Sequence, residues 1–314
     1  MATAVRTGLR RWAGRRSAEG FRYWSALAGL LVPVVLISIV LVLVLQAQPA
    51  LNRFGLGFLA GRAWNPVKQE FGALPFLYGT VATSLLALLM ALPVGVGVAL
   101  FLAEPGLPRV RGALGLGVEL LAGIPSVVYG IWGLYVLAPW LLEHLSKPLT
   151  LRLGAFPLFA GPARQTSLLL ASIVIAIMIL PTLASISREV LKAVPNGIRE
   201  ASLALGATWW ETVWRVVLPA ARAGIFGATV LALGRALGET IAVTMVIGNT
   251  PVIQASLFGP AYTLASVIAN EFSEATGQVY TAALLELGLV LVLLTLVINL
   301  LALLLVRNTG RQLS

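Results

Sequence analysis

Six long apolar runs dominate this 314-residue chain and restrict it to one class of fold. Each run has about the 20 apolar residues that a helix needs to cross the hydrocarbon core of a bilayer. None alternates apolar and polar residues as a membrane barrel does, and a helix satisfies its own backbone hydrogen bonds within lipid. We therefore expect an all-α polytopic membrane protein with six transmembrane helices, at residues 25–46, 76–102, 113–140, 167–187, 222–248 and 280–306.

The composition supports this class and excludes several others. Hydrophobic residues make up 59% of the chain and charged residues 11%, whereas a soluble domain has roughly 25% charged residues. The net charge of +10 is explained by a basic rim on a membrane protein, which excludes nucleic-acid binding as its cause. The run from Ala26 to Leu45 is too long for the apolar part of a signal peptide. The absence of cysteine and the single histidine, His144, argue against a metal site or a thiol nucleophile.

Lysine and arginine are unevenly distributed between the two sets of connecting segments. Fifteen lie in or beside the N-terminal tail, the second and fourth connecting segments and the C-terminus, against six in the opposite loops. The positive-inside rule therefore predicts that both termini are cytoplasmic. We expect a basic cytoplasmic tail at 1–23, a transmembrane domain at 24–306 with a cytoplasmic loop at 188–221, and a cytoplasmic C-terminal tail at 307–314.

Two charged residues interrupt the fifth apolar run. A charge near the bilayer centre costs about 2.5 to 3.5 kcal/mol on insertion scales, so this pair needs a compensating role. Arg235 and Glu239 are four residues apart, which would place them on one helical face, where they can pair. The planar guanidinium of an arginine suits the oxygens of phosphate or sulfate. The carboxylate can pair with the guanidinium when no anion is bound, and it keeps an anion from binding too tightly. We expect Arg235, Glu239 and the adjacent Thr240 to line a substrate pathway. The alternative is an ion pair that locks two helices together.

Other runs contain helix breakers and further charges. Pro93, Pro125 and Pro181 should each kink or open a helix. A helix that restarts at Ser126, after Pro125, would present backbone N–H groups and a positive dipole end to an anion. Ser126 is therefore a further pathway residue. Two carboxylates within spans, Glu119 and Glu286, can either line the pathway or sit near an interface.

The segment from Glu200 to Pro219 looks like a compact pair of helices made for contact with a partner in water. Asn196 is predicted to cap the first helix and Gly206 to end it. Thr208 and Glu211 have the spacing of a capping box for the second, and Pro219 can begin a third. The segment contains three tryptophans, Trp209, Trp210 and Trp214. Tryptophan is a residue type that often dominates binding at protein interfaces, although a tryptophan-rich helix can also lie on the inner leaflet of the membrane.

This segment resembles the EAA signature of the permease subunits of ABC importers. The matching residues are Glu200, Ala201, Ser202, Gly206, Val216, Leu218 and Pro219. Serine replaces the second alanine of the signature, and valine replaces its isoleucine. Two further segments, GIPSVVYGIWGL at 123–134 and LGRALGETIAVTMVIGN at 233–249, are similar to those of phosphate permeases of the PstC type. The resemblance covers about residues 70 to 306.

The resemblance implies a type I ABC importer permease of the MetI-like fold in a bacterial or archaeal cytoplasmic membrane. It implies a second, PstA-like permease chain, two copies of a PstB-like ATPase, and a PstS-like phosphate-binding protein outside the cell. The coupling helix would run from Glu200 to Trp214, and Arg235 with Glu239 would be important for transport. ATP and Mg²⁺ would be bound by the ATPase and no cofactor by this chain, which has no phosphate-binding G-x-x-x-x-G-K-[ST] loop.

Rival functions remain open from the residues alone. One arginine can serve any tetrahedral oxyanion, so a permease for sulfate or molybdate is the nearest alternative. A membrane enzyme acting on phospholipid or polyprenyl phosphate is another, but the chain has no cluster of acids arranged for metal or acid–base chemistry. A scaffold role would predict that neutralising Arg235 leaves solute uptake unchanged.

Overall fold

The computed structural model describes residues 2–104 and 108–310, with side chains described for 22–104 and 108–304. In that part of the chain, six helices are long and apolar enough to cross a membrane, which confirms the predicted number and class. They are Arg22–Phe54, Leu74–Ala103, Ser126–Leu153, Leu168–Lys192, Trp209–Leu237 and Gln278–Leu304. The side chains of the predicted basic tail up to residue 21, and those of residues 305–314, lie outside the described part.

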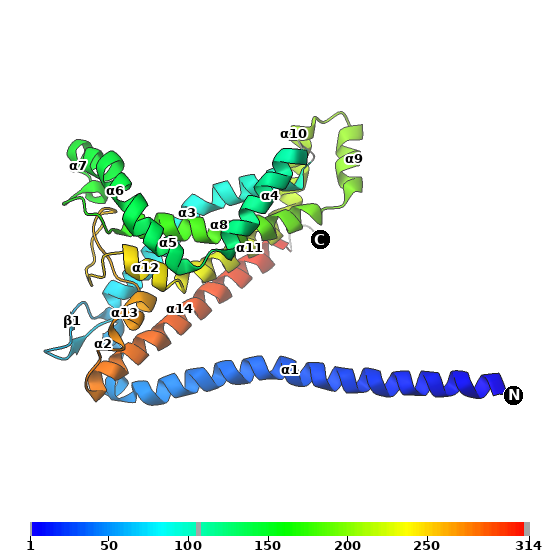
Figure 1. The fold of residues 1–314 in the computed structure, drawn as a ribbon, viewed down its shortest axis with the longest axis horizontal. Coiled ribbons are helices and arrows are strands. Elements are labelled where there is room, and N and C mark those ends of the chain that lie inside the picture. Colours follow the sequence, from blue (N-terminus) through cyan, green and yellow to red (C-terminus); the bar gives the residue numbers. More distant parts are fainter. Residues whose placement is uncertain (1, 105–107, 311–314) are drawn as a thin grey trace.

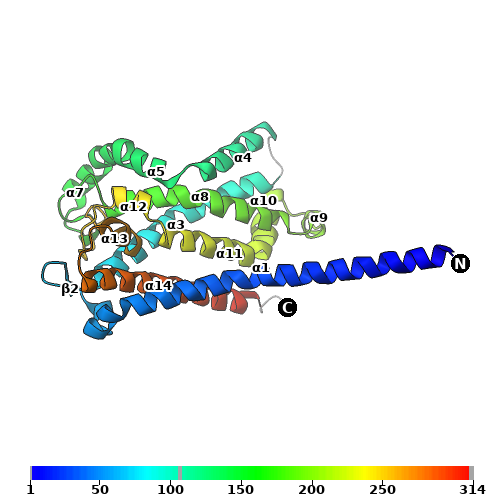
Figure 2. The ribbon, with the colours of Figure 1, turned by 60° about the horizontal axis from the view of Figure 1, so that its bottom comes forward.

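The first helix, α1 (Ala2–Phe54), contains the first span and continues through the predicted tail. It packs on α14 (Gln278–Gly310), where Leu43 lies against Gly288. Its N-terminal part extends beyond the bundle (Figures 1 and 2). Most of its large apolar side chains in the span are exposed, as expected of a helix that faces lipid. After α2 (Gly57–Ala60), an antiparallel pair of two-residue strands, β1 (Trp64–Asn65) and β2 (Glu70–Phe71), leads into the bundle.

The centre of the bundle is the pair of α3 (Leu74–Ala103) and α8 (Leu168–Lys192), which pack along each other. The helix α11 (Leu218–Leu237) contacts both α8 and α3, and it also contacts α14. The main apolar core joins α3 and α8 to α5 (Ser126–Trp132) and α12 (Ile241–Val246). Gly130 brings α5 onto α12, because a Cβ there would lie only 3.2 Å from the Ala242 Cα.

The third apolar run is divided into two helices, so the predicted span at 113–140 is wrong. The first helix, α4 (Pro108–Gly123), is separate, and the membrane-length helix begins at Ser126 and continues to Leu153. Pro125 separates them with an extended backbone, φ −61° and ψ 143°. Proline cannot donate a helical hydrogen bond and disfavours helical geometry in the residue before it. The break predicted at Pro125 is therefore confirmed, and it moves the whole span towards the C-terminus.

Three other prolines do not break their helices, because a wide π-helical turn precedes each. These turns are Gly133–Leu137, Leu142–Ser146 and Val213–Val217, and each ends two residues before Pro139, Pro148 or Pro219. The residue before each proline donates its N–H to the carbonyl five residues earlier, which widens the turn. The turns connect α5 to α6 (Ala138–Leu141), α6 to α7 (Lys147–Leu153), and α10 (Trp209–Thr212) to α11. Pro219 therefore lies in the first turn of α11, as predicted, but α11 follows the π-helical turn without a break, so one membrane-length helix runs from Trp209 to Leu237.

The fifth span also differs from the predicted 222–248. It begins at Trp209 and ends at Leu237, where Gly238 follows and the chain turns into the separate α12. The stretch 249–279, predicted as a connecting loop, contains α13 (Leu264–Glu271) and is buried without interruption at residues 258–267. A backbone hydrogen bond from Leu168 to Gly259 ties this stretch to the start of α8, and one from Ala261 to Ile247 ties it to the end of α12.

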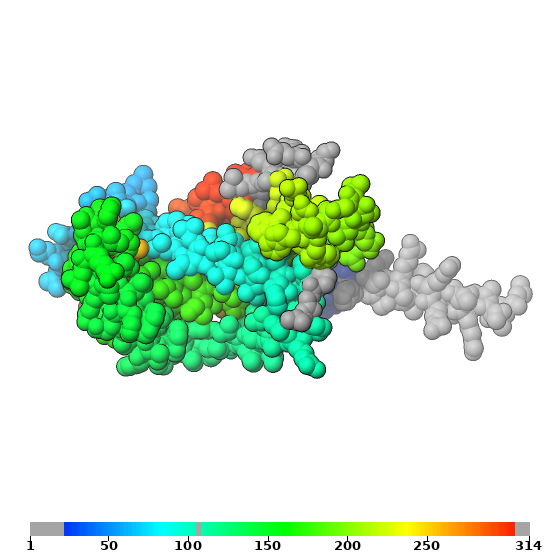
Figure 3. Space-filling model, turned by 90° about the horizontal axis from the view of Figure 1, so that it is seen from above, coloured from blue at the N-terminus to red at the C-terminus, as the bar shows by residue number. Residues whose placement is uncertain are grey.

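The two ends of the bundle differ in character. The end of α14 lies near α9 (Asn196–Ala204) and α10, and α1 starts on that side as well (Figures 1 and 2). We call this the α9 end. The β1–β2 pair, α7 and α13 lie at the opposite end, which we call the α13 end. The space-filling view from above shows the α9–α10 segment, in yellow-green, projecting from the body of the molecule (Figure 3).

Candidate functional site

The break after α11 separates the two charged residues that were predicted to pair. Among the described residues, Arg235 and Glu239 do not form an ion pair, so that prediction is wrong. Gly238 follows the last helical residue, and Glu239 lies beyond it, off the helical face of Arg235. Its carboxylate accepts hydrogen bonds from the backbone N–H groups of Ala242 and Thr240, at the start of α12. Glu239 therefore stabilises the exposed N–H groups that a helix start presents.

Arg235 instead contacts the middle of α8. Its Nη1 donates a hydrogen bond to Thr182 Oγ1 at 3.3 Å. At a rise of about 1.5 Å per residue, Thr182 lies about 15 Å from the Lys192 end of α8, close to the middle of a bilayer about 30 Å thick. The Arg235 charge also interacts with the Tyr129 phenol of α5. The guanidinium is otherwise exposed, so it can bind an anion without first leaving a stronger partner.

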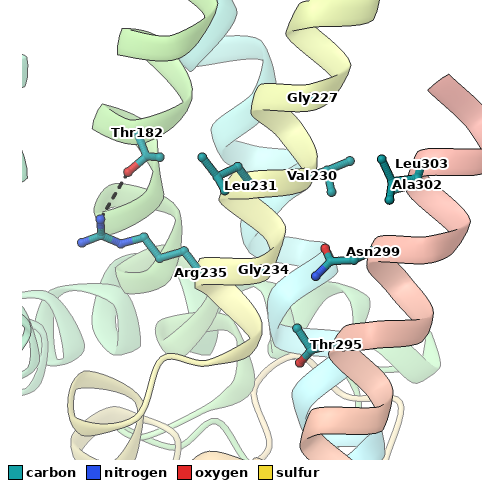
Figure 4. Close-up of a pocket in the computed structure, with 10 residues that line it drawn as sticks. All are labelled: Thr182, Gly227, Val230, Leu231, Gly234, Arg235, Thr295, Asn299, Ala302 and Leu303. Atoms are coloured by element: carbon teal, nitrogen blue, oxygen red, sulfur yellow. Dashed lines mark hydrogen bonds between the residues drawn. The ribbon is translucent and has the colours of Figure 1, made fainter. Parts of the chain in front are cut away.

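A cavity of about 650 Å³ lies beside Arg235, between α8, α11 and α14. Its polar side chains are those of Arg235, Thr182, Thr295 and Asn299, and its other lining residues are Gly227, Val230, Leu231, Gly234, Ala302 and Leu303. Asn299 points from α14 towards α11, whereas Arg235 extends from α11 towards Thr182 (Figure 4). The lining residues of α14 lie in its C-terminal half, whereas those of α11 lie in the half of that helix farther from α10, so the cavity lies near the middle of the bundle.

The cavity can hold a small polar anion. One guanidinium supplies charge and several N–H donors, while hydroxyl and amide groups can donate further hydrogen bonds. Most of the lining is apolar, so a bound anion would be held by few groups and could be released. Among the described residues, no cluster of histidine, cysteine, aspartate or glutamate could hold a metal ion.

The other predicted pathway residues do not line this cavity. Thr240 lies at the start of α12, where its hydroxyl donates to the Gly238 carbonyl at 3.0 Å. Ser126 begins α5 and is half-buried. Glu119 is exposed on α4, whereas Glu286 is buried in α14, with no hydrogen-bond partner for Oε2 among the described residues. The roles of Ser126, Glu239 and Thr240 in a pathway remain predictions.

Sequence reasoning missed the polar residues on other helices that line the cavity with Arg235. Thr182 sits beside Pro181 in α8, and Thr295 and Asn299 are four residues apart in α14. The α14 pair had a readable signal, because two polar residues at helical spacing in an apolar run share one face. Thr182 had none, since single threonines are common in membrane helices.

The predicted coupling segment has the expected two-helix form. Thr208 and Glu211 form a reciprocal capping box at the start of α10. Gly206 follows α9 with a φ of +88°, and it donates to Leu203 O while Ala207 donates to Ser202 O. This is the Schellman arrangement that ends a helix with a left-handed glycine. The predicted cap by Asn196 is wrong, because Pro195 holds the cap position and Asn196 is already the first helical residue.

The surface of this segment is available to a partner. Glu200 and Ala201 are exposed on α9, and Pro219 is exposed while Leu218 is half-buried. Trp209, Trp210 and Trp214 are 37%, 66% and 53% exposed. The rings of Trp210 and Trp214 pack edge to face with centroids 5.6 Å apart. The three tryptophans line a cavity of about 720 Å³ against α3.

Comparison with known proteins agrees with this architecture. A family model described as "Binding-protein-dependent transport system inner membrane component" matches residues 92–313. The chain is 47% identical over 283 residues to a protein of Mesorhizobium japonicum named "Phosphate transport system permease protein PstC", covering 88% of this chain and 86% of the relative. It is 35% identical to "Phosphate transport system permease protein PstC 1" of Mycobacterium tuberculosis, with 94% and 95% covered.

Solved structures show the same fold at low sequence identity. A bacterial alginate ABC transporter chain aligns with a TM-score of 0.58 at 18% identity, covering 90% of this chain and 93% of the other. A chain of the MetNI methionine ABC transporter, in an inward-facing conformation, aligns with a TM-score of 0.54 at 19% identity, covering 74% and 94%.

Proposed function

Because the chain belongs to the family of binding-protein-dependent transport system inner membrane components, we propose that it is a permease subunit of an ATP-driven importer of inorganic phosphate. The chain is a multi-pass membrane protein. Two relatives, whose alignments cover 88% and 94% of this chain, are named as phosphate transport permeases. In this proposal it forms half of the translocation pathway and hydrolyses no ATP. A separate ATPase, a second permease chain and an external phosphate-binding protein complete the importer, in the PstB-, PstA- and PstS-like roles.

The observation that carries the proposal is Arg235 at the edge of a mostly apolar cavity that contains three further polar side chains, near the middle of the bundle. Phosphate at neutral pH carries one to two negative charges and needs hydrogen-bond donors when it leaves water. Arg235 supplies the charge, while Thr182, Thr295 and Asn299 supply neutral donors around the same cavity. The same constellation could accept sulfate or molybdate, which is the alternative substrate class.

The α9 end is cytoplasmic in this proposal. The basic residues of the connecting segments gather on that side, and the exposed α9–α10 segment lies there (Figure 3). The ATPase binds this segment through Glu200, Ala201 and the tryptophans. When the ATPase dimer closes on ATP, it displaces α9, and the helices rock between states that open the cavity to opposite sides.

Uptake of labelled phosphate tests the proposal directly. Cells or proteoliposomes with the complete importer should take up phosphate only when this chain is present, and excess sulfate should not compete. Arg235→Gln should reduce uptake strongly without lowering the amount of chain in the membrane. Arg152→Gln is the matched control, because Arg152 is an exposed arginine at the α13 end. Uptake that excess sulfate abolishes would support the alternative oxyanion, and uptake that is indifferent to the chain would refute the proposal.

A further inference from the structure

The helix α9 has almost no apolar attachment to the rest of the protein. All nine of its residues are described, and Arg199 is the only one of them whose side chain is buried. Most of the others, including the large apolar Ile198 and Leu203, are exposed. A hydrogen bond of 2.9 Å between the Ser202 and Thr212 hydroxyls joins α9 to α10, and α9 also lies against the π-helical turn Val213–Val217. Arg199 is therefore the one side chain through which α9 is buried against the rest of the protein.

Arg199 connects α9 to the ends of both central helices. Its Nη1 forms an ion pair with Glu104 Oε1, directly after α3. Its Nη2 donates a hydrogen bond of 2.8 Å to the carbonyl of Leu191, in the last turn of α8. The side chains of Arg199 and Glu104 are only 11% and 9% exposed, so water screens their interaction poorly. The planar guanidinium can reach both acceptors at once, which a lysine ammonium cannot do with the same geometry.

The buried carboxylate of Glu104 needs the positive charge of Arg199, because of the helix ends that surround it. Glu104 is the C-terminal cap of α3, and Leu191 lies in the last turn of α8, so both helices direct the negative ends of their dipoles to this point. A buried carboxylate there is unfavourable unless a cation pairs with it. Among the described residues, Glu104 Oε2 and Arg199 Nε have no hydrogen-bond partner, so no wider network replaces the pair.

We propose that Arg199 is the positioning residue that transmits displacement of α9 to α3 and α8 during transport. This inference rests on the proposed function, in which a partner ATPase moves α9. A displacement of α9 pulls on Glu104 and Leu191, and α8 is a continuous helix from Leu191 to Thr182. Thr182 accepts the hydrogen bond of Arg235, so a shift of α8 changes the surroundings of the cation at the cavity. Arg199 touches neither phosphate nor ATP in this scheme.

The test separates coupling from folding by measuring two activities of one complex. The importer is reconstituted in proteoliposomes with its binding protein, and uptake of labelled phosphate and hydrolysis of ATP are recorded together. Arg199→Gln should lower the phosphate taken up per ATP hydrolysed by about tenfold, within the range of typical coupling energies, while assembly and hydrolysis continue. Glu104→Gln should act in the same direction. Arg199→Lys keeps the charge but cannot reach Glu104 and the Leu191 carbonyl with the same geometry, so it should recover only part of the lost uptake.

The control is Lys192→Gln, which removes a positive charge nearby from a solvent-exposed pair with Glu189. It should leave the ratio of uptake to hydrolysis unchanged. The inference is overturned if Arg199→Gln keeps the wild-type ratio, or if Lys192→Gln lowers it equally. It is also overturned if assembly, hydrolysis and uptake fall together in both Arg199→Gln and Glu104→Gln, because the pair would then serve folding alone. A wild-type complex that takes up no phosphate would overturn the proposed function, and the inference with it.

Discussion

The turn between α9 and α10 allows a backbone effect to be tested without any steric one. Gly206 has a φ of +88°, and a Cβ built at this position would meet nothing within 4 Å. An alanine there would therefore clash with nothing and would only suffer the left-handed backbone, which costs an L-residue roughly 1 to 2 kcal/mol. Asparagine tolerates this conformation better, so Gly206→Asn should cost less than Gly206→Ala.

The cost should appear as local opening of the turn. The amides of Gly206 and Ala207 are bonded to Leu203 O and Ser202 O, at 3.0 and 3.2 Å. A loss of 1 to 2 kcal/mol makes the open state about 5 to 30 times more populated. Hydrogen exchange of peptides covering 202–208 should accelerate by that factor in Gly206→Ala and by less in Gly206→Asn. Phosphate uptake should fall in the same order, because α9 loses its fixed angle to α10.

Gly197 provides the control in the same helix. It lies near the start of α9 with no positive φ, and its Cβ position is also open. Gly197→Ala should leave exchange of the turn unchanged or slightly slower, because alanine favours a helix by about 0.8 to 1 kcal/mol over glycine. Equal exchange and equal uptake in Gly206→Ala and Gly197→Ala would refute the argument that the left-handed turn positions α9.

Three further predictions concern the cavity and the bundle. Thr182→Val should weaken uptake several-fold through a higher KM, since the exposed bond to Arg235 should contribute about 0.5 to 1.5 kcal/mol; an unchanged KM would show that Thr182 does not position Arg235. Glu239→Gln should impair transport while leaving insertion and ATPase binding intact, and loss of the chain from the membrane would instead indicate a structural role. Gly79→Ala should lower the midpoint of thermal unfolding, because its Cβ would lie 2.2 Å from the Tyr262 carbonyl oxygen, an overpacking that costs about 1 to 3 kcal/mol. Gly97→Ala, in open space on the same helix, should not lower it.

Local chemistry explains which features could be predicted from the sequence. Six apolar runs predicted six membrane-length helices, and the structure has six in its described part. The capping box of Thr208 and Glu211 and the left-handed Gly206 were also predicted correctly. Each of these depends on residues within a few positions of one another, so no knowledge of the fold is needed.

Breaks within the runs were predicted less well, because proline acts differently in different surroundings. Pro125 separates two helices, whereas Pro219 lies in a continuous helix that widens into a π-helical turn. The residues next to each proline do not distinguish these outcomes. At Gly238 the reverse happened: a glycine expected within a helix ended it, and Glu239 turned to the start of α12.

The sequence by itself determined the membrane class, the number of spans and the two-helix form of the segment from Glu200 to Pro219, because hydrophobic length and local capping act along the chain. Only the tertiary structure decided which side chains meet, such as Arg235 with Thr182 across 53 positions and Arg199 with Glu104 across 95. In a soluble protein, the polar face of a helix would indicate its orientation. Membrane helices are apolar on nearly every side, so the rotation of each helix, and with it the partners of its few polar residues, is set by packing against its neighbours.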